Sequence, residues 1–251
     1  MAIDGKISAV AEGFLRLNQL RKRLMEAGVH GFLVPQADEH QGEYLAEHSQ
    51  RLRWLTGFDG SAGTVLLFKK QTFLFVDGRY LLQANQQFKN SEIEVRHFRE
   101  PPLADWLASQ AVEGDKIGFD PNLHSISQID NLRGALVKAR AELVPIAKNP
   151  IDSMWVNQPA CPDMPVELHP LEYSGQGSDD KLTILAEVIC AAGAKSAVLN
   201  QMEATAWALN VRGSDTANTP LVQGYSVVHG DGTADFFVAR SKVSAEVEAG
   251  L

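Results

Sequence analysis

Four side chains able to bind a metal ion lie close together in the chain: His40, Glu43, Glu47 and His48. On one helix, the first three would lie on successive turns of the same face, and imidazole and carboxylate groups are zinc ligands. However, the spacing matches no defined metal motif, and Gly42 would weaken a helix at that point. We therefore favour a polar surface segment and predict no metal ligand, with a small metalloenzyme built on these residues as an alternative.

Arg79 is the second candidate for chemistry. It follows an apolar run in the sequence Asp77-Gly-Arg-Tyr80, where a helix is expected to begin. With Asp77 as N-cap, Arg79 lies in the first turn, where the helix dipole disfavours a cation. Such local violations occur at functional sites. The alternative interpretation is an ion pair with Asp59 or Asp77.

Three glycines precede this arginine at equal spacing: Gly57, Gly60 and Gly63. Because glycine tolerates positive φ and close backbone approach, we expect a tight, irregular loop that leads into a strand. Asp59 lies within it. The spacing matches neither the dinucleotide-binding fingerprint nor the P-loop.

Other catalytic motifs are missing from the sequence. There is no Gly-x-Ser-x-Gly elbow, Cys-x-x-Cys pair or His-Glu-x-x-His motif. Ser61 has small neighbours, but no histidine and aspartate partners can be assigned to it. The remaining histidines are expected to be ordinary surface or core residues: His30, His97, His124, His169 and His229.

Apolar periodicity predicts alternating helices and strands, and hence an α/β fold. A helix over 6–27 has its apolar stripe at Ile7, Val10, Phe14, Leu17 and Leu24. The further predicted helices cover 79–88, about 102–107 and 127–139. The predicted strands cover 31–34, 64–68, 72–76, 93–98, 117–119 and 143–146.

The pattern then repeats. A proline-rich and glycine-rich stretch, in which Trp155 is expected to pack on a neighbouring domain, is followed by a helix capped by Ser178 and by strands at 196–199, 225–228 and 234–238. Trp54 precedes Gly60-Ser61 by six residues, and Trp207 precedes Gly213-Ser214 by the same spacing. We interpret this as a tandem duplication of one α/β unit.

The predicted division is a domain over 1–148, a linker over 149–178 and a second similar domain over 179–251. The second copy has fewer predicted elements than the first. We therefore expect it to be truncated and the chain to be part of something larger.

Composition limits the classes of partner. The chain has 251 residues and a net charge of −8, which argues against binding nucleic acid. Two cysteines are too few for a disulfide framework, so a reducing compartment fits best. No segment has the length and hydrophobicity of a membrane span. We predict a cytoplasmic protein.

Several motifs together give the sequence a family resemblance. They are His40-Gln-Gly-Glu43-Tyr44, Gly57-Phe-Asp-Gly-Ser-Ala-Gly63-Thr64, Asp77-Gly-Arg-Tyr80, Asn149-Pro-Ile-Asp152-Ser-Met-Trp155 and Asn210-Val-Arg-Gly-Ser-Asp215. In this order they resemble the N-terminal part of Xaa-Pro aminopeptidases (aminopeptidase P) of the creatinase-like metallopeptidase family.

The resemblance implies a creatinase N-terminal-like mixed-sheet domain, followed by an incomplete second copy. It also implies that the C-terminal pita-bread catalytic domain, with two divalent ions that are typically manganese, is absent from this chain. The chain alone is then predicted inactive. Arg79 matches a family arginine that contacts substrate peptide. For Arg212 and Asp215 we expect an ion pair within or between domains.

The leading hypothesis is therefore the N-terminal portion of a metal-dependent Xaa-Pro aminopeptidase, which releases the residue preceding proline. This portion would restrict access, help to bind peptides with proline at the second position and support a homodimer. The alternative is a stand-alone creatinase-N-like binding or interaction module without catalysis.

Overall fold

The computed structural model describes the backbone of residues 2–251 and the side chains from residue 12 onward. Ile7 and Val10 of the predicted apolar stripe lie outside the described side chains. The chain forms two compact units. Unit 1 contains Met1–Ala37 and Gln50–Gln158, and unit 2 contains Asp38–Ser49 and Pro159–Leu251.

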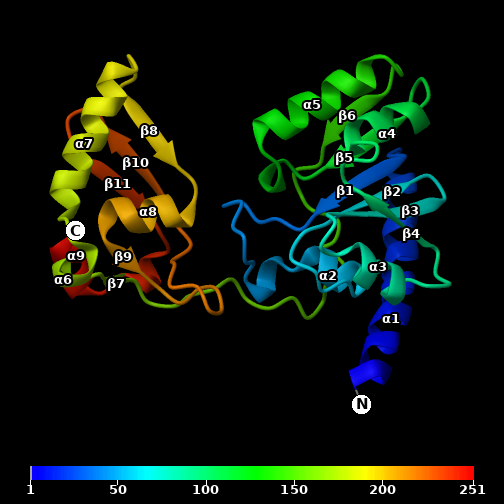
Figure 1. The fold of residues 1–251 in the computed structure, drawn as a ribbon, viewed down its shortest axis with the longest axis horizontal. Helices are drawn as coiled ribbons and strands as arrows, with labels where there is room; N and C mark the ends of the chain where they lie inside the picture. Colours follow the sequence, from blue (N-terminus) through cyan, green and yellow to red (C-terminus); the bar gives the residue numbers. More distant parts are fainter. Residues whose placement is uncertain (1) are drawn as a thin grey trace. The chain divides into compact units, whose positions relative to one another are not determined.

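Unit 1 is built on a six-stranded mixed sheet with the order β4-β3-β2-β1-β5-β6 (Figure 1). Strands β1, β2 and β3 pair antiparallel, while β4, β5 and β6 join in parallel pairs. This confirms the predicted mixed α/β class. The strands are β1 (Gly31–Pro35), β2 (Thr64–Phe68), β3 (Gln71–Val76), β4 (Ile93–His97), β5 (Lys116–Phe119) and β6 (Glu142–Pro145).

Helices cover both faces of this sheet, which is why the central strand β2 is buried at every position. Val34 and Leu67 face one core, and their neighbours Leu33 and Leu66 face the other. Helices α1 (Ala2–Glu26) and α2 (Arg51–Thr56) contribute to the first core, beside α3 (Leu81–Gln87). Helices α4 (Leu103–Gln110) and α5 (Ile126–Val137) contribute to the second. The 3₁₀ turn η2 (Pro121–Leu123) precedes α5.

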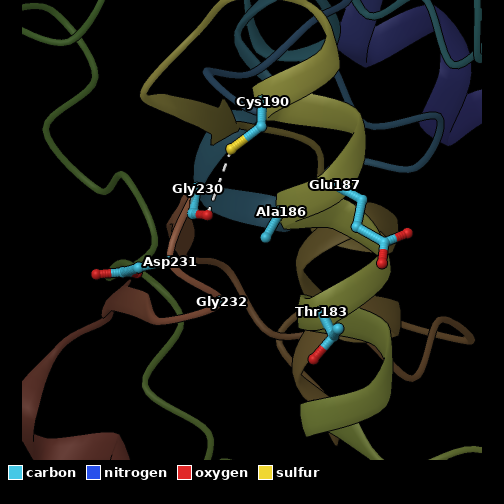
Figure 2. Close-up of a pocket in the computed structure, with 7 residues that line it drawn as sticks. All are labelled: Thr183, Ala186, Glu187, Cys190, Gly230, Asp231 and Gly232. Carbon is cyan, nitrogen blue, oxygen red and sulfur yellow. Dashed lines mark hydrogen bonds between the residues drawn. The ribbon is translucent and has the colours of Figure 1, made fainter.

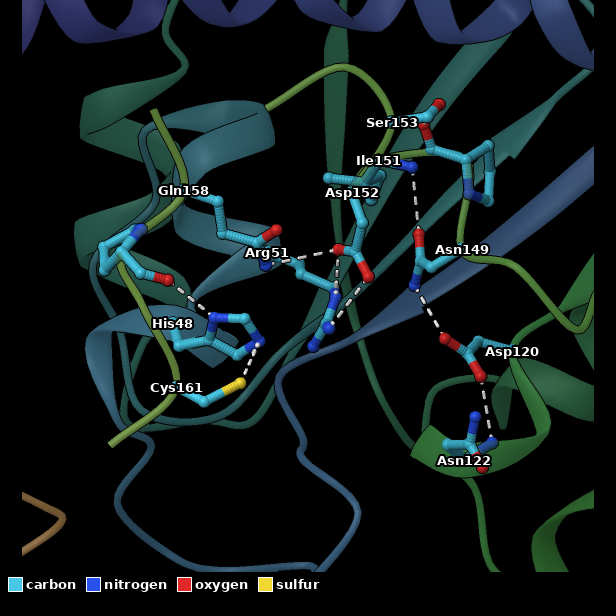
Figure 3. Close-up of polar contacts among 12 residues, drawn as sticks. His48, Arg51, Asp120, Asn122, Asn149, Ile151, Asp152, Ser153, Gln158 and Cys161 are labelled. Atoms are coloured by element: carbon cyan, nitrogen blue, oxygen red, sulfur yellow. Dashed lines mark hydrogen bonds and ion pairs between the residues drawn. The ribbon is translucent and has the colours of Figure 1, made fainter. Parts of the chain in front are cut away.

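Unit 1 also includes the segment after β6 that contains the Asn149-Pro-Ile-Asp152 motif. Asn149 donates to the Asp120 carboxylate at 2.9 Å and accepts from the Ile151 amide at 3.0 Å (Figure 3). Arg51 of α2 forms a bidentate ion pair with Asp152, in which Nε and Nη2 donate to the two carboxylate oxygens at 2.7 and 3.0 Å. Through these contacts, the Asn-Pro-Ile-Asp motif holds this segment against the rest of unit 1.

Unit 2 has a three-stranded antiparallel sheet with the order β11-β10-β8 and a two-stranded sheet of β7 and β9. Its core lies between the larger sheet and helices α7 and α8. Its elements are η1 (Glu47–Ser49), β7 (Glu167–Leu168), α6 (Leu171–Ser174), α7 (Ser178–Ala191), β8 (Ser196–Leu199), α8 (Met202–Leu209), β9 (Val211–Arg212), β10 (Tyr225–His229), β11 (Ala234–Phe237), η3 (Arg240–Lys242) and α9 (Ala245–Gly250).

The two units share one topology over five elements. In unit 1 the order along the chain is α1, β1, α2, β2, β3, and the strands lie in the sheet as β3-β2-β1. In unit 2 the order is α7, β8, α8, β10, β11, with the two-residue strand β9 inserted between α8 and β10, and the strands of the larger sheet lie as β11-β10-β8. Trp54 and Trp207 occupy the second helix of each series. This agreement supports the duplication inferred from the sequence.

Two local predictions need correction. Helix α3 begins at Leu81 rather than Arg79, because the Asp77 side chain closes a turn on the Arg79 amide before the helix starts. Helix α7 is capped by Gly177, and Ser178 is its first residue. Trp155, predicted to pack from the linker onto a neighbouring domain, does stack on Trp54 of the first predicted domain, with ring centroids 5.3 Å apart, and both residues belong to unit 1.

The stretch over 149–178 contains strand β7 and helix α6. Its first ten residues, 149–158, belong to unit 1, and the rest belong to unit 2. Among the described residues, no helix combines the length and apolar character required to cross a membrane.

Candidate functional site

The glycine-rich loop over 57–63 connects α2 to β2. Helix α2 ends at Gly57, whose φ of 79° places it in the left-handed region that favours glycine. The Gln87 side chain donates to the Gly57 carbonyl at 2.6 Å, which ties the loop to α3. Thr56 reinforces the turn by accepting from the Phe58 amide at 3.1 Å.

Two aromatic rings fill the space that Gly60 and Gly63 leave. Phe58 is fully buried and meets Tyr80 edge to face, with ring centroids 6.0 Å apart. A Cβ atom at Gly60 would overlap the Phe58 ring and lie 2.9 Å from Cδ1 of Tyr80. At Gly63 it would lie 3.3 Å from the Phe58 ring. The loop therefore holds Tyr80 in place from one side.

Arg79 lies in the turn between β3 and α3, one residue before the N-cap Tyr80. Its Nε and Nη2 atoms donate to the Asp77 carboxylate, with a shortest distance of 2.6 Å. The guanidinium carbon lies 5.4 Å from the centre of the Tyr80 ring, within cation–π range. The side chain is 67% exposed, so the cation is anchored yet accessible to solvent.

The electrostatics of this turn depend on the same contact. Hydrogen bonds from the Arg79 side chain lower the pKa of the Asp77 carboxyl, helped by the charge of Arg79. Asp77 therefore remains ionised at neutral pH and keeps the guanidinium oriented. Asp77, one of the two partners considered for Arg79, makes this ion pair. Asp59 accepts a hydrogen bond from Gln83 at 2.6 Å.

Tyr80 and Ser61 complete the arrangement, although the sequence alone assigned a role to neither residue. Their hydroxyl oxygens lie 2.8 Å apart, which joins the glycine loop to the Arg79 turn. An exposed, oriented guanidinium beside two hydroxyl groups can donate hydrogen bonds to a carbonyl or a carboxylate. It offers no nucleophile paired with a base.

The histidine and acidic segment does not form the helix that a metal site would need. His40 is buried, stacks on Tyr225 at 4.5 Å and contacts the Asn200 carbonyl at 3.0 Å through Nδ1. The Asp38 carboxylate accepts from the amides of His40 and Gly42, which makes a turn. Among the described side chains, no group of three or more His, Cys, Asp or Glu residues is placed to hold a metal ion.

Asp215 forms an ion pair, but with Lys242 rather than with Arg212. The Asp215 carboxylate is fully buried and accepts from Lys242 Nζ at 2.8 Å and from the Gln223 amide at 2.6 Å. Arg212 donates instead to the backbone carbonyls of Ala206 and Val211. Both residues therefore stabilise unit 2 internally.

Unit 2 also contains a shallow surface pocket of about 320 Å³ between α7 and the β10–β11 turn (Figure 2). Cys190 lies at one end, where its thiol donates to the Gly230 carbonyl at 3.4 Å. The lining residues are Thr183, Ala186, Glu187, Cys190, Gly230, Asp231 and Gly232.

Known proteins resemble this chain over most of its length. It is 35% identical over 239 residues to "Aminopeptidase P2" of Arabidopsis thaliana, and 33% identical over 236 residues to a "Probable Xaa-Pro aminopeptidase P" of Ajellomyces capsulatus. Each alignment covers 93% of this chain but only 34% and 38% of the relative. The chain thus spans about a third of the length of these curated relatives.

A solved structure also matches nearly the whole of this chain and only part of its own length. An X-prolyl aminopeptidase from Caenorhabditis elegans, described as a cytosolic enzyme with a di-nuclear active site, matches with a TM-score of 0.89 and 28% identity. The match covers 95% of this chain and 40% of that protein.

Two family signatures with one description cover nearly the whole chain. The Creatinase/Prolidase N-terminal domain matches residues 16–154, and a second signature of that description matches residues 157–251. Two adjacent matches of this kind agree with the repeated topology of the two units. The chain belongs to the Creatinase/Prolidase N-terminal domain family.

Proposed function

We propose that this chain is the non-catalytic N-terminal portion of a metal-dependent Xaa-Pro aminopeptidase. The observation that carries the proposal is the coverage: relatives with this activity in their names match 93% of the chain, and the chain accounts for 34–38% of them. The parent enzyme would release the N-terminal residue that precedes proline. Its two divalent ions, which we propose to be manganese, would be bound by the part of the enzyme that lies outside this chain.

The proposed roles of this portion are to restrict access to the catalytic domain, to help bind peptide and to support a homodimer. Arg79 is the proposed peptide contact, because it is anchored on Asp77 and 67% exposed. Its guanidinium would donate to a backbone carbonyl or to the C-terminal carboxylate of a peptide with proline at the second position. A cytoplasmic location is proposed by analogy with the cytosolic C. elegans enzyme.

The test is peptide hydrolysis with added manganese. The purified 251-residue chain is compared with the same chain extended by the coding sequence that follows codon 251. Activity against Xaa-Pro peptides only in the extended protein is the expected result. Activity in the chain alone would contradict the assignment of catalysis to another domain. No activity in either protein would favour a stand-alone binding module.

A further inference from the structure

Cys161 and His48 of unit 2 form a thiol–imidazole pair that the proposed peptidase role does not use. The Cys161 sulfur lies 3.4 Å from Nε2 of His48, although the two residues are 113 positions apart in the sequence. The other ring nitrogen, Nδ1, lies 2.6 Å from the carbonyl oxygen of Pro159. Figure 3 shows the His48 ring with one nitrogen directed at the sulfur of Cys161.

The Pro159 carbonyl determines which nitrogen of His48 carries the proton. A carbonyl oxygen can only accept a hydrogen bond, so Nδ1 is the donor. In the neutral imidazole Nε2 then has the free electron pair, and the Cys161 thiol donates its hydrogen to it. Proton transfer along this contact leaves a thiolate beside an imidazolium. A nucleophile, a base in contact with it and a third group that orients the base form the arrangement that activates cysteine.

Cys190 provides a comparison within the same chain. It is the only other cysteine, and both thiols are free and exposed. Its sulfur donates to the Gly230 carbonyl at 3.4 Å, as Figure 2 shows. A carbonyl accepts the thiol hydrogen but cannot take the proton, so this contact gives Cys190 no base.

We propose that Cys161 is a modification site activated by His48, with small-molecule disulfides as its reaction partners. The Cys161 thiol proton moves to Nε2 of His48, and the thiolate attacks one sulfur of the disulfide. A new S–S bond forms, the S–S bond of the reagent breaks, and its other half leaves as a thiolate. The product is a mixed disulfide on Cys161, and the disulfide reagent is the oxidant.

The test uses 4,4′-dithiodipyridine, an aromatic disulfide whose released thiol is coloured. Cys190→Ser leaves only Cys161 in the chain, and Cys161→Ser leaves only Cys190. At neutral pH the Cys161 protein is expected to react about tenfold faster than the Cys190 protein, because His48 is in contact with the Cys161 sulfur and can take its proton as the sulfur attacks. Adding His48→Gln to Cys190→Ser is expected to remove that difference.

His169→Gln in the Cys190→Ser background is the control, since it removes another histidine of unit 2, one whose ring contacts Tyr173. It should leave the rate unchanged. Circular dichroism verifies that each variant is folded, and peptide mapping of the unmutated chain after partial reaction gives the order of labelling without any substitution. Equal labelling of the two cysteines, or an unchanged rate after His48→Gln, would overturn the proposal.

Discussion

Arg79 is held by Asp77 in a way that suits reversible contact with a ligand. The ion pair orients the guanidinium, yet two thirds of the side chain remains exposed. An exposed ion pair of this kind contributes little to the stability of the fold, so its role must be a different one, such as orienting the guanidinium. Substitution of Arg79 should therefore leave the fold intact, so that its effect on peptide binding can be measured by kinetics.

In the extended enzyme, Arg79→Ala is expected to raise KM for Xaa-Pro peptides by about tenfold, the cost of one lost hydrogen bond to a charged group. The effect on kcat should be smaller, because Arg79 is proposed to bind peptide rather than to react with it. Steady-state kinetics measures both constants. Arg133→Ala, which removes another exposed arginine–aspartate pair, is the control. Equal kinetics for the two variants would remove the assigned role.

The pKa of Asp77 gives a second prediction at this scale. Since Arg79 lowers it below the ordinary value of 3.8, the pair is fully formed above that pH and is lost as the pH falls through the lowered value. Carbon-detected NMR should therefore find a lower titration midpoint for Asp77 in the unmutated chain than in Arg79→Ala. Coinciding midpoints would show that the ion pair does not persist in solution.

At the scale of elements, the glycine loop and α3 are fitted to each other by aromatic packing. Gly60→Ala is expected to lower the free energy of unfolding by about 1–3 kcal/mol, because its Cβ would overlap the buried Phe58 ring. Urea denaturation measures the change. Gly134→Ala in α5 is the matched control, since its Cβ meets nothing within 4 Å. It should be neutral or slightly stabilising.

In unit 2, the buried ion pair between Asp215 and Lys242 links residues that are distant in the sequence. Both side chains are almost completely buried, at 0% and 4% exposure. Asp215→Ala is expected to cost about 3–5 kcal/mol, because it leaves the Lys242 ammonium buried and unpaired. Urea denaturation of unit 2 measures this loss.

A double-mutant cycle makes that test more specific. Lys242→Met added to Asp215→Ala should recover part of the lost stability, since no unpaired charge remains. Glu248→Ala breaks the exposed pair with Arg240 and should cost under about 1 kcal/mol. A similar loss in Asp215→Ala and Glu248→Ala would contradict the role given to burial.

At the scale of the whole molecule, two units of one topology are joined in one chain. Each has a hydrophobic core of its own, so each has the structural basis for a separate unfolding transition. In unit 1, helices pack on both faces of the sheet. In unit 2, Val198 and Phe237 of the three-stranded sheet are exposed at 69% and 55%.

The proposed dimer belongs to this scale. Sedimentation equilibrium of the extended protein is expected to give twice the mass of one chain at micromolar concentration. Because closed dimers bury a matched surface on both copies, the mass should not rise further with concentration. A single-chain mass over the whole range would remove dimerisation from the proposed function.

The sequence by itself determined the local features of this protein. Short apolar runs located the strands over 64–68 and 196–199 at their observed bounds, because such patterns depend on near neighbours. The spacing of glycines marked the loop before β2, and the repeated tryptophan and Gly-Ser spacing pointed to two similar units. Helix starts were less certain: competing turn hydrogen bonds moved the start of α3 from Arg79 to Leu81.

Only the tertiary structure decided which distant residues meet. It grouped residues 38–49 with unit 2, paired Asp215 with Lys242 and brought His48 to Cys161. Periodicity shows which face of an element is apolar, but not which other element will cover that face. Long-range polar partners follow from the complete packing of both cores, since a buried charge is stable only beside the group that the final arrangement supplies.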